Sequence, residues 1–438
     1  FAMIGTIFSL VYLVAFVYHV IRKIQPERII FETSKTISVD AWKEIVENKG
    51  RIDLTLSVFK PFMILEQIMI KSVNNNDVFT FAQGLSILFY RMENYLKEIQ
   101  KEFQSSEKSQ KPNLNSSYLY KFFFMIFSPL LSESLTHGRE QFIIQYQWHV
   151  FKQIHIFYGD KDFRSVQDFW EHLDYVGHKI FDLEMISASE LFLKQLHQFM
   201  KLELETVKKT VIVLPKNSVG HIHHSNDETI DRILTDDFDS RINSLTEFGI
   251  TSSAKRMKHL PNSILNILRE TLEVVLTIPD GITRRSITFS VLSSFEKIHE
   301  VSIKNGMRNS IWTSYWLEHY VEKIDKRNSN DAKLVTEVLS RLSVSSVKHS
   351  DYSSILQLGV NCRRLADDYP DLVVIILDNL EKCFEIVKNE IDPEKRETWL
   401  KELIQEVESA EKWNVKKHPQ ITMKVQEILD KNNSLNTN

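Results

Sequence analysis

The sequence predicts an all-α protein, with one N-terminal transmembrane helix followed by about six helical hairpins stacked as in an α-solenoid. Three observations predict this fold. Gly (11) and Pro (10) are scarce among 438 residues, whereas all-β proteins need many turns built from these residues. Residues 1–21 contain no charged side chain. The remaining chain alternates amphipathic stretches with short polar breaks, which is typical of helical hairpins.

The first segment, residues 1–23, has the properties of a membrane-spanning helix. At about 1.5 Å per residue, its uncharged part would be roughly 30 Å long, which matches the hydrocarbon core of a bilayer. Arg22 and Lys23 follow directly, and the positive-inside rule then places the C-terminal body in the cytoplasm. A signal peptide fits less well, because the apolar run is too long and no basic residue precedes it.

A stripe of small residues runs along this first segment. Ala2, Gly5 and Ser9 share one helical face, and such a face lets another membrane helix approach closely. We therefore expect these three residues to pack against a second copy of the segment or against another transmembrane helix. The chain begins with Phe1 and not with Met, so further upstream transmembrane helices stay open as an alternative.

The body divides into four parts after the anchor. A juxtamembrane connector (24–53) leads into hairpins 1–3 (54–213), a His-rich loop and linker (214–239), and hairpins 4–6 with a C-terminal helix (240–438). The helices of these hairpins are recognised by apolar residues at helical spacing. The six predicted pairs are 54–72 with 77–100, 117–135 with 139–157, 165–184 with 189–210, 240–258 with 262–277, 283–304 with 308–325, and 351–367 with 371–389.

Three further segments complete this description. A terminal helix is predicted over 393–413, and residues 104–115 and 326–333 have the polar composition of linkers. Two glycines, Gly249 and Gly359, fall inside predicted helices, where Gly costs about 1 kcal/mol relative to Ala. We expect both to mark points at which two helices approach closely.

Composition excludes several classes of function. The net charge of −4 and the pI near 6.5 do not resemble the basic footprint of a nucleic-acid binder. Cys362 and Cys383 are isolated and are expected to be reduced core residues. The sequence lacks a phosphate-binding loop, a nucleophile elbow, a His-Glu-x-x-His helix and paired Cys-x-x-Cys motifs. No cofactor is predicted.

Two clusters contain potential metal ligands. On a helix, Asp174, His178 and Asp182 would fall at i, i+4 and i+8 and form one stripe of carboxylates and imidazole. The alternative is a solvated helical Asp–His pair, and no matching stripe for a second helix is found. The second cluster is His221, His223 and His224. Its residues lie in a predicted loop without a zinc-site spacing, which favours a flexible His-rich loop over a metal site.

Paired basic residues are a third candidate feature. Arg284-Arg285 and Arg363-Arg364 could hold a phosphate group, but solvated helix ends are the simpler interpretation. The acidic run 236–239 precedes a predicted helix and suits its N-terminus, where the helix dipole favours negative charge.

One short stretch resembles a known family. Asn76-Asp77-Val78-Phe79-Thr80, followed by Leu85, is similar to an Asn-Asp-Pro-Phe-Thr…Leu stretch in a family of uncharacterised predicted prokaryotic membrane proteins. Val78 stands where that family has Pro. In the family, transmembrane helices precede a mostly helical soluble part, so the resemblance implies membrane topology and no activity. Asp77 as a helix N-cap explains the same residues.

These observations favour a membrane-anchored cytoplasmic scaffold or sensor module, because stacked hairpins present extended surfaces to partner proteins. The expected partners are the membrane and other protein subunits, including copies of the same chain, but not nucleic acid. Two alternatives stay open: a subunit of an oligomeric channel or transporter, and a metal-dependent enzyme that uses Asp174, His178 and Asp182.

Overall fold

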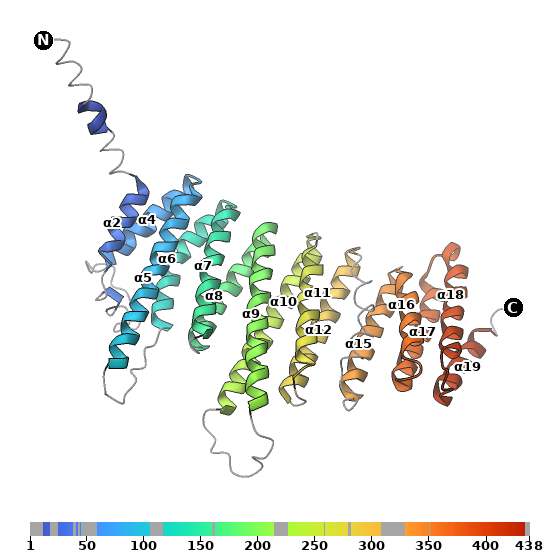
Figure 1. The fold of residues 1–438 in the computed structure, drawn as a ribbon. Helices are drawn as coiled ribbons and strands as arrows, with labels where there is room; N and C mark the ends of the chain where they lie inside the picture. The colour runs from blue at the N-terminus through green and yellow to red at the C-terminus, as the bar shows by residue number, and fades with distance from the viewer. Residues whose placement is uncertain are drawn as a thin grey trace. The chain divides into compact units, whose positions relative to one another are not determined.

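The structure is a computed structural model, and its helices fall into two compact units. Every regular element among the described residues is an α-helix, and no strand occurs in them, so the all-α class is confirmed. Residues 1–195 form unit 1 and residues 196–438 form unit 2; the helix α9 (Ile186–Val213) belongs to both (Figure 1). The described residues are 12–17, 25–37, 41–42, 44, 59–105, 117–159, 163–213, 227–257, 259–278, 282–307, 329–349 and 351–433.

Unit 1 contains two layers of helices. Each helix contacts both its hairpin partner and the equivalent helix of the next hairpin: α4 packs against α5 and α6, α5 against α7, and α6 against α7 and α8. The bounds are α2 (Pro26–Lys35), α4 (Lys60–Asn74), α5 (Val78–Ser105), α6 (Ser117–Thr136), α7 (Glu140–Gly159) and α8 (Phe163–Asp182).

Unit 2 follows the same plan. There α10 packs against α11 and α12, α15 against α16 and α17, and α17 against α18 and α19. The bounds are α10 (Asp227–Ala254), α11 (Leu260–Val275), α12 (Ile282–Lys304), α15 (Ser329–Lys348), α16 (Ser353–Leu365), α17 (Pro370–Glu390), α18 (Pro393–Lys412) and α19 (Pro419–Asn433).

Contacts between the helices of unit 2 recur at nearly constant sequence separations. Thr246 of α10 donates to Ser294 of α12, which lies 48 residues later. Arg341 of α15 bonds to Glu296 of α12 across 45 residues, and Lys424 of α19 to Glu381 of α17 across 43. Helices related by such constant offsets run parallel and in register. The hairpins of unit 2 therefore form a helical repeat of about 45 residues, close to the hairpin length that the sequence predicts.

Among the described residues, six chain reversals contain the same type of hydrogen bond. At each, a backbone N–H donates to the carbonyl five residues earlier, at 2.8–3.0 Å, which is the long bond of a Schellman motif. Five of the six acceptors are buried serines. We call these reversals the serine turns, although one begins with Ile180. The donor–acceptor pairs are Asp77–Ser72, Arg139–Ser134, Met185–Ile180, Met257–Ser252, Met307–Ser302 and Asp351–Ser346.

The backbone of the serine turns explains part of their sequence. Gly138 and Gly306 precede the donor residue with φ of 60° and 73°, a region that Gly enters without steric cost. At equivalent positions Asn76, Glu184 and Arg256 adopt φ of 59°, 56° and 54°. Each such turn ends one helix and reverses the direction of the chain. These turns therefore form the hairpins that the polar breaks in the sequence predict.

Small polar side chains let α10 and α12 pack closely. A Cβ added to Gly249 would lie 2.5 Å from the Cδ1 atom of Ile298, so only Gly leaves room for this side chain. Ser253 and Ser302 share a hydrogen bond of 2.6 Å in the same interface, where both are fully buried. The predicted close approach at Gly249 is confirmed, with an Ile side chain as the group that approaches.

The predicted helix boundaries need four corrections. Helix α2 lies in the predicted juxtamembrane connector, α15 begins in a predicted linker, and α19 lies beyond the predicted terminal helix. The linker prediction at 326–333 is wrong from Ser329 onward, where α15 begins and buries Asp331 and Ala332. The acidic run 236–239 lies inside α10, which begins at Asp227, and so does not cap a helix at residue 240.

Parts of the prediction fall outside the described residues. Of the predicted transmembrane segment, only residues 12–17 are described; they are helical and exposed. The remainder, including Ala2, Gly5 and Ser9, is outside them, as is the predicted helix 308–325. Among the residues that the structure does describe, no helix has the length and apolar character needed to cross a membrane.

Candidate interaction surface

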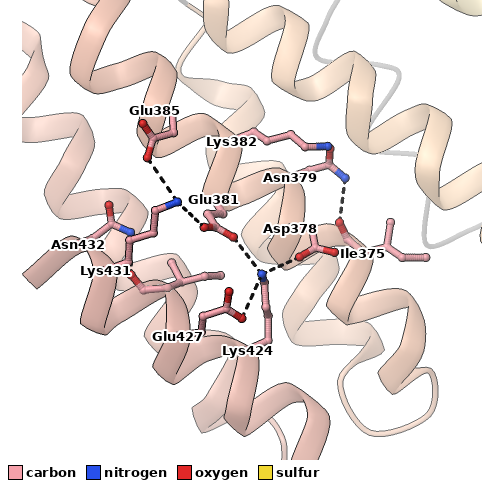
Figure 2. Close-up of polar contacts among 11 residues, drawn as sticks. Ile375, Asp378, Asn379, Glu381, Lys382, Glu385, Lys424, Glu427, Lys431 and Asn432 are labelled. Atoms are coloured by element: carbon pink, nitrogen blue, oxygen red, sulfur yellow. Dashed lines mark hydrogen bonds and ion pairs between the residues drawn. The ribbon is translucent and has the colours of Figure 1, made fainter.

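A network of charged side chains joins α17 to α19 (Figure 2). The Lys424 ammonium lies 2.8 Å from a carboxylate oxygen of Asp378, 2.9 Å from Glu381 and 3.4 Å from Glu427. The Lys431 ammonium lies 2.8 Å from the other oxygen of Glu381. Hydrogen bonds from these two lysines lower the pKa of Glu381. The charged groups of this network pair with one another. The network therefore joins two helices and is not a ligand site.

Two of the paired basic residues are in ion pairs between helices. The Arg284 guanidinium lies 2.8 Å from Asp331 and donates to the Ile278 carbonyl; its side chain is only 5% exposed. Arg363 of α16 donates to Glu406 of α18. The interpretation of these arginines as solvated helix ends is therefore wrong for both. Their partners lie one repeat away in the sequence, so the pairing becomes predictable only once the repeat length is known.

Gly359 makes room for the second of these ion pairs. A Cβ at this position would overlap the carboxylate group of Glu406. Glu406 is 5% exposed, and burial raises the pKa of its carboxyl group while Arg363 lowers it. The expected close approach at Gly359 is confirmed, and the group that approaches is a carboxylate.

In unit 1, polar bonds fix α7 against α5. His149 is buried, its Nε2 lies 3.2 Å from the Ser86 hydroxyl, and its ring stacks on Phe89. Burial, with a contribution from Lys152, lowers the pKa of His149 to about 4, so the ring is neutral at pH 7. One turn further along α7, the Gln153 amide donates to Glu93 at 2.7 Å. These bonds hold the two helices parallel and in a fixed register.

Tyr90 and Trp148 are two of the large aromatic side chains that lie exposed on α5 and α7. Tyr90 of α5 is 59% exposed and Trp148 of α7 is 50% exposed. Trp148 contacts the buried His149 ring edge-on, with the ring centroids 4.8 Å apart. Exposed aromatic residues on a rigid support are typical of protein-binding hot spots. We call Tyr90 and Trp148 the aromatic pair. Sequence analysis missed it, because neither residue departs from the apolar pattern of a helix.

A further buried polar contact joins α7 to α8. The Tyr146 hydroxyl lies 2.5 Å from Nε2 of His172, between α7 and α8. Burial raises the pKa of Tyr146 and lowers that of His172 to about 4, so both groups are neutral at pH 7. Tyr146 is 2% exposed, which keeps it from solvent. The pair therefore acts in packing.

The predicted metal ligands are only partly brought together. Asp174 and His178 lie on α8 with 3.7 Å between a carboxylate oxygen and Nε2, and Asp182 is exposed at the end of the same helix. Among the described residues, no group of three or more His, Cys, Asp or Glu side chains is placed to hold a metal ion. His221, His223 and His224 lie outside the described residues.

The stretch that resembles a membrane-protein family forms the first serine turn. Asn76 has a φ of 59°, and the Asp77 carboxylate accepts a hydrogen bond of 3.0 Å from the Thr80 N–H. Asp77 is therefore the N-cap of α5, as expected. Phe79 is 70% exposed, and the geometry of the turn does not explain why an aromatic residue stands at this position.

Known structures include a neighbour of this chain, whereas sequence comparisons find no relative. No protein-family model matches this sequence, and no curated protein matches it. One solved structure, described as a circular tandem repeat protein with novel repeat topology and enhanced subunit contact surfaces, is similar at 12% identity. The alignment covers 94% of this chain and 97% of that chain, with a TM-score of 0.43.

Proposed function

We propose that this protein is a membrane-attached interaction scaffold whose α5–α7 face binds a protein partner. The observation that carries the proposal is the aromatic pair: Tyr90 and Trp148 are exposed on neighbouring parallel helices that part-buried hydrogen bonds hold in register. Rigid aromatic side chains lose little conformational entropy on binding and bury a large area. A repeat of hairpins supplies the fixed support that such a site needs.

Tyr175 provides a matched control for this proposal. It is 52% exposed on α8, but the Lys179 ammonium of the same helix lies 5.6 Å from its ring centroid. Its ring is thus partly engaged within the chain. We expect a photo-crosslinking amino acid at position 148 to form a discrete adduct in cells and the same group at position 175 to form none.

The decisive measurement is binding of the partner identified from that adduct. With both proteins purified, Trp148→Ala should weaken binding at least about tenfold, whereas Tyr175→Ala should leave it unchanged. Identical adducts from both positions, or equal affinities of both variants, would contradict the proposed face. Circular dichroism of each variant checks that the helices are intact.

Membrane attachment through the first segment is the second part of the proposal. It is supported by the absence of charge in residues 1–21 and by the exposed apolar side chains of residues 12–17. The test is alkaline extraction of membranes from cells that express the full chain. The chain should stay in the pellet, and Val14→Asp should release it, whereas Phe31→Asp, at a 50% exposed position outside the run, should not. Release of the unaltered chain would contradict attachment.

A further inference from the structure

The exposed side of α5 and α7 carries no charged side chain over about three helical turns. Residues 78–90 of α5 and 141–151 of α7 contain no Asp, Glu, Lys or Arg, and the buried His149 is neutral at pH 7. We call the solvent-exposed side of these two stretches the neutral face; it includes the aromatic pair. At 1.5 Å per residue, the longer stretch extends about 18 Å along α5.

The neighbouring helices differ from the neutral face in charge. Helix α2 packs against α5 and exposes Glu32 and Lys35. On the other side, α9 contacts α7 and exposes Glu190 and Lys194. A charged side chain that becomes buried in an interface loses its hydration, which costs free energy unless the charge is paired. The neutral face can therefore be covered by another protein surface without this cost.

Each helix contributes one row of exposed or half-buried side chains to this face. The row on α5 is Phe79, Gln83, Ser86 and Tyr90, and the row on α7 is Gln141, Gln145, Trp148 and the adjoining Lys152. Both rows are spaced by four, three and four residues, which places their side chains on one side of a helix. Because this spacing is the same in both directions, each row can lie against an antiparallel copy of itself.

The two rows are centred at the same height. The row on α5 is centred between residues 84 and 85 and the row on α7 between residues 146 and 147, so the centres differ by 62 residues. Contacts between the two helices span similar separations: 63 residues from Ser86 to His149 and 60 from Glu93 to Gln153. One two-fold axis can therefore pass both centres and pair both rows with their copies.

Charges at the ends of the neutral face favour an antiparallel arrangement. Asp77 and Glu140 directly precede the two uncharged stretches, and Arg91 and Lys152 directly follow them. An antiparallel copy places the acidic end of one face against the basic end of the other. The dipoles of antiparallel helices also attract one another.

Two further charges reduce this contrast but keep its sign. Arg139 precedes Glu140, and Glu93 lies 3.5 Å from Lys152. With them included, two acids and one base give a net charge of −1 at the N-terminal end of the face, and two bases and one acid give +1 at the C-terminal end. The ends of two antiparallel copies are therefore complementary.

The size of the neutral face predicts a reversible contact. Two helices, each about 10 Å wide and about 18 Å long over these stretches, present roughly 360 Å² per copy. Interfaces of standard size bury about 800 Å² per partner, and smaller ones are typical of transient complexes. We therefore expect association in the micromolar range.

We propose that the neutral face binds the same face of a second copy of this chain about a two-fold axis, so that each α5 and each α7 lies antiparallel to its counterpart. This inference rests on the proposed α5–α7 face and names its partner. Phe79 of each copy then lies opposite Tyr90 of the other, and Trp148 lies opposite Gln145. Amides and hydroxyls both donate and accept hydrogen bonds, so the polar members of the rows can satisfy their own copies.

Cross-linking between single cysteines tests this arrangement. The full chain, purified in detergent, carries either Phe79→Cys or Tyr90→Cys and is treated with a short bis-maleimide. The two positions are 11 residues apart in sequence, or about 17 Å along the helix, so the cysteines of two identical variants stay far apart. Cys362 and Cys383 are fully buried, and burial raises the pKa of both thiols, which protects them from the reagent.

A mixture of the two variants brings the cysteines opposite each other and should give an adduct of twice the chain mass. Each variant alone should give little. A mixture of Glu171→Cys and Tyr175→Cys, two exposed positions of α8, is the matched control and should also give little. Equal yields in all samples, or no adduct in the mixture of Phe79→Cys and Tyr90→Cys, would overturn the inference.

Sedimentation of the full chain measures the affinity of the dimer. The unaltered chain should change from monomer to dimer between about 1 and about 100 µM. Trp148→Ala should weaken the dimer at least about tenfold, whereas Tyr175→Ala should leave it unchanged. A dimer of equal affinity in Trp148→Ala would place the contact on another surface and overturn the inference.

The photo-crosslinking group at position 148 separates this inference from the proposed function. An adduct of twice the chain mass supports both. An adduct with a different protein, and none with a second copy, would overturn the self-association and leave the proposed face standing. The absence of any adduct from position 148 would refute the face itself.

Discussion

The ion pair between Lys424 and Glu381 lies at the centre of the contact between α17 and α19. The Lys424 ammonium lies 2.9 Å from the Glu381 carboxylate, and its side chain is only 14% exposed. Burial lowers the pKa of Lys424, but hydrogen bonds to Asp378 and Glu381 raise it further, so the lysine is charged at every physiological pH. Besides this network, α19 is fixed by the buried stripe Ile421, Val425 and Ile428.

Loss of the Lys424 charge should loosen α19. Lys424→Met leaves Asp378 and Glu381 close together without their shared cation, and we expect a loss of about 1–3 kcal/mol in local stability. Lys401→Met removes a lysine that is 73% exposed and paired only with Glu397, so it should cost under about 0.5 kcal/mol. Hydrogen exchange of the α19 amides measures both. Similar exchange rates in the two variants would show that the apolar stripe alone holds α19.

The same network should respond to acid. Hydrogen bonds from Lys431 and Lys424 hold the pKa of Glu381 below its usual value. A carboxyl group with a lowered pKa stabilises the folded state above its unfolded pKa of about 4.3 and loses this effect as pH falls through the lower folded value. The protection factors of the α19 amides, which correct for the intrinsic pH dependence of exchange, should therefore fall below about pH 4. In Glu381→Gln, the loss of α19 protection in acid should disappear. If it persists, other carboxylates cause it.

Gly359 should tolerate no side chain. In Gly359→Ala, the new Cβ would overlap the carboxylate group of Glu406, and overpacking of this kind costs about 1–3 kcal/mol. Urea unfolding measures the loss. Gly359→Ala combined with Glu406→Ala should lose less than the sum of the two single variants, because the clash disappears with the carboxylate. If the stability losses of the two single variants add up in the double variant, the clash with Glu406 does not explain the cost of Gly359→Ala.

The hairpins were predictable because their turns interrupt the apolar pattern. Predicted helices 117–135 and 139–157 agree with α6 and α7 to within two residues at each end. The missed helix α15 is rich in serine, and its buried Ser340, Ser343 and Ser346 are suited to close helix packing. Seen without a partner helix, such residues are indistinguishable from a linker. The spacing of Ile421, Val425 and Ile428 was a visible signal for α19.

The candidate surface was less predictable than the fold. The ion pair between Arg363 and Glu406 spans 43 residues, and no local pattern links the two. Once the repeat length is known, Glu406 becomes the expected neighbour of Arg363, and Asp331 that of Arg284 across a similar separation. The exposure of Trp148 depends on which side of α7 faces α5. This orientation is fixed by contacts between residues far apart in sequence, such as Ser86 with His149 and Glu93 with Gln153.

The buried His299 should make unit 2 sensitive to mild acid. Burial lowers its pKa to about 4, partly offset by a hydrogen bond to the Leu342 carbonyl and by Asp351. The unfolded chain binds a proton at about pH 6.5, so stability should be complete above that pH and fall by up to about 1.4 kcal/mol per pH unit between 6.5 and 4. Urea unfolding at several pH values should show a flatter profile in His299→Gln than in His349→Gln, which changes an exposed histidine. Equal slopes in the two variants would assign the acid sensitivity to His149 and His172.

The serine turns allow opposite predictions at two equivalent positions of unit 1. Gly138 has a φ of 60° and no atom within 4 Å of an added Cβ, so Gly138→Ala should cost about 1 kcal/mol through backbone conformation alone. Glu184 has a φ of 56°, and Glu184→Gly should relieve a similar strain and gain roughly 0.5–1 kcal/mol. Glu184→Ala is the matched control, since it removes the same carboxylate but keeps the strained backbone. Thermal unfolding should rank Glu184→Gly above the unaltered chain and Gly138→Ala below it. If Glu184→Ala stabilises as much as Glu184→Gly, the gain comes from lost charge and the left-handed backbone carries no cost at this turn.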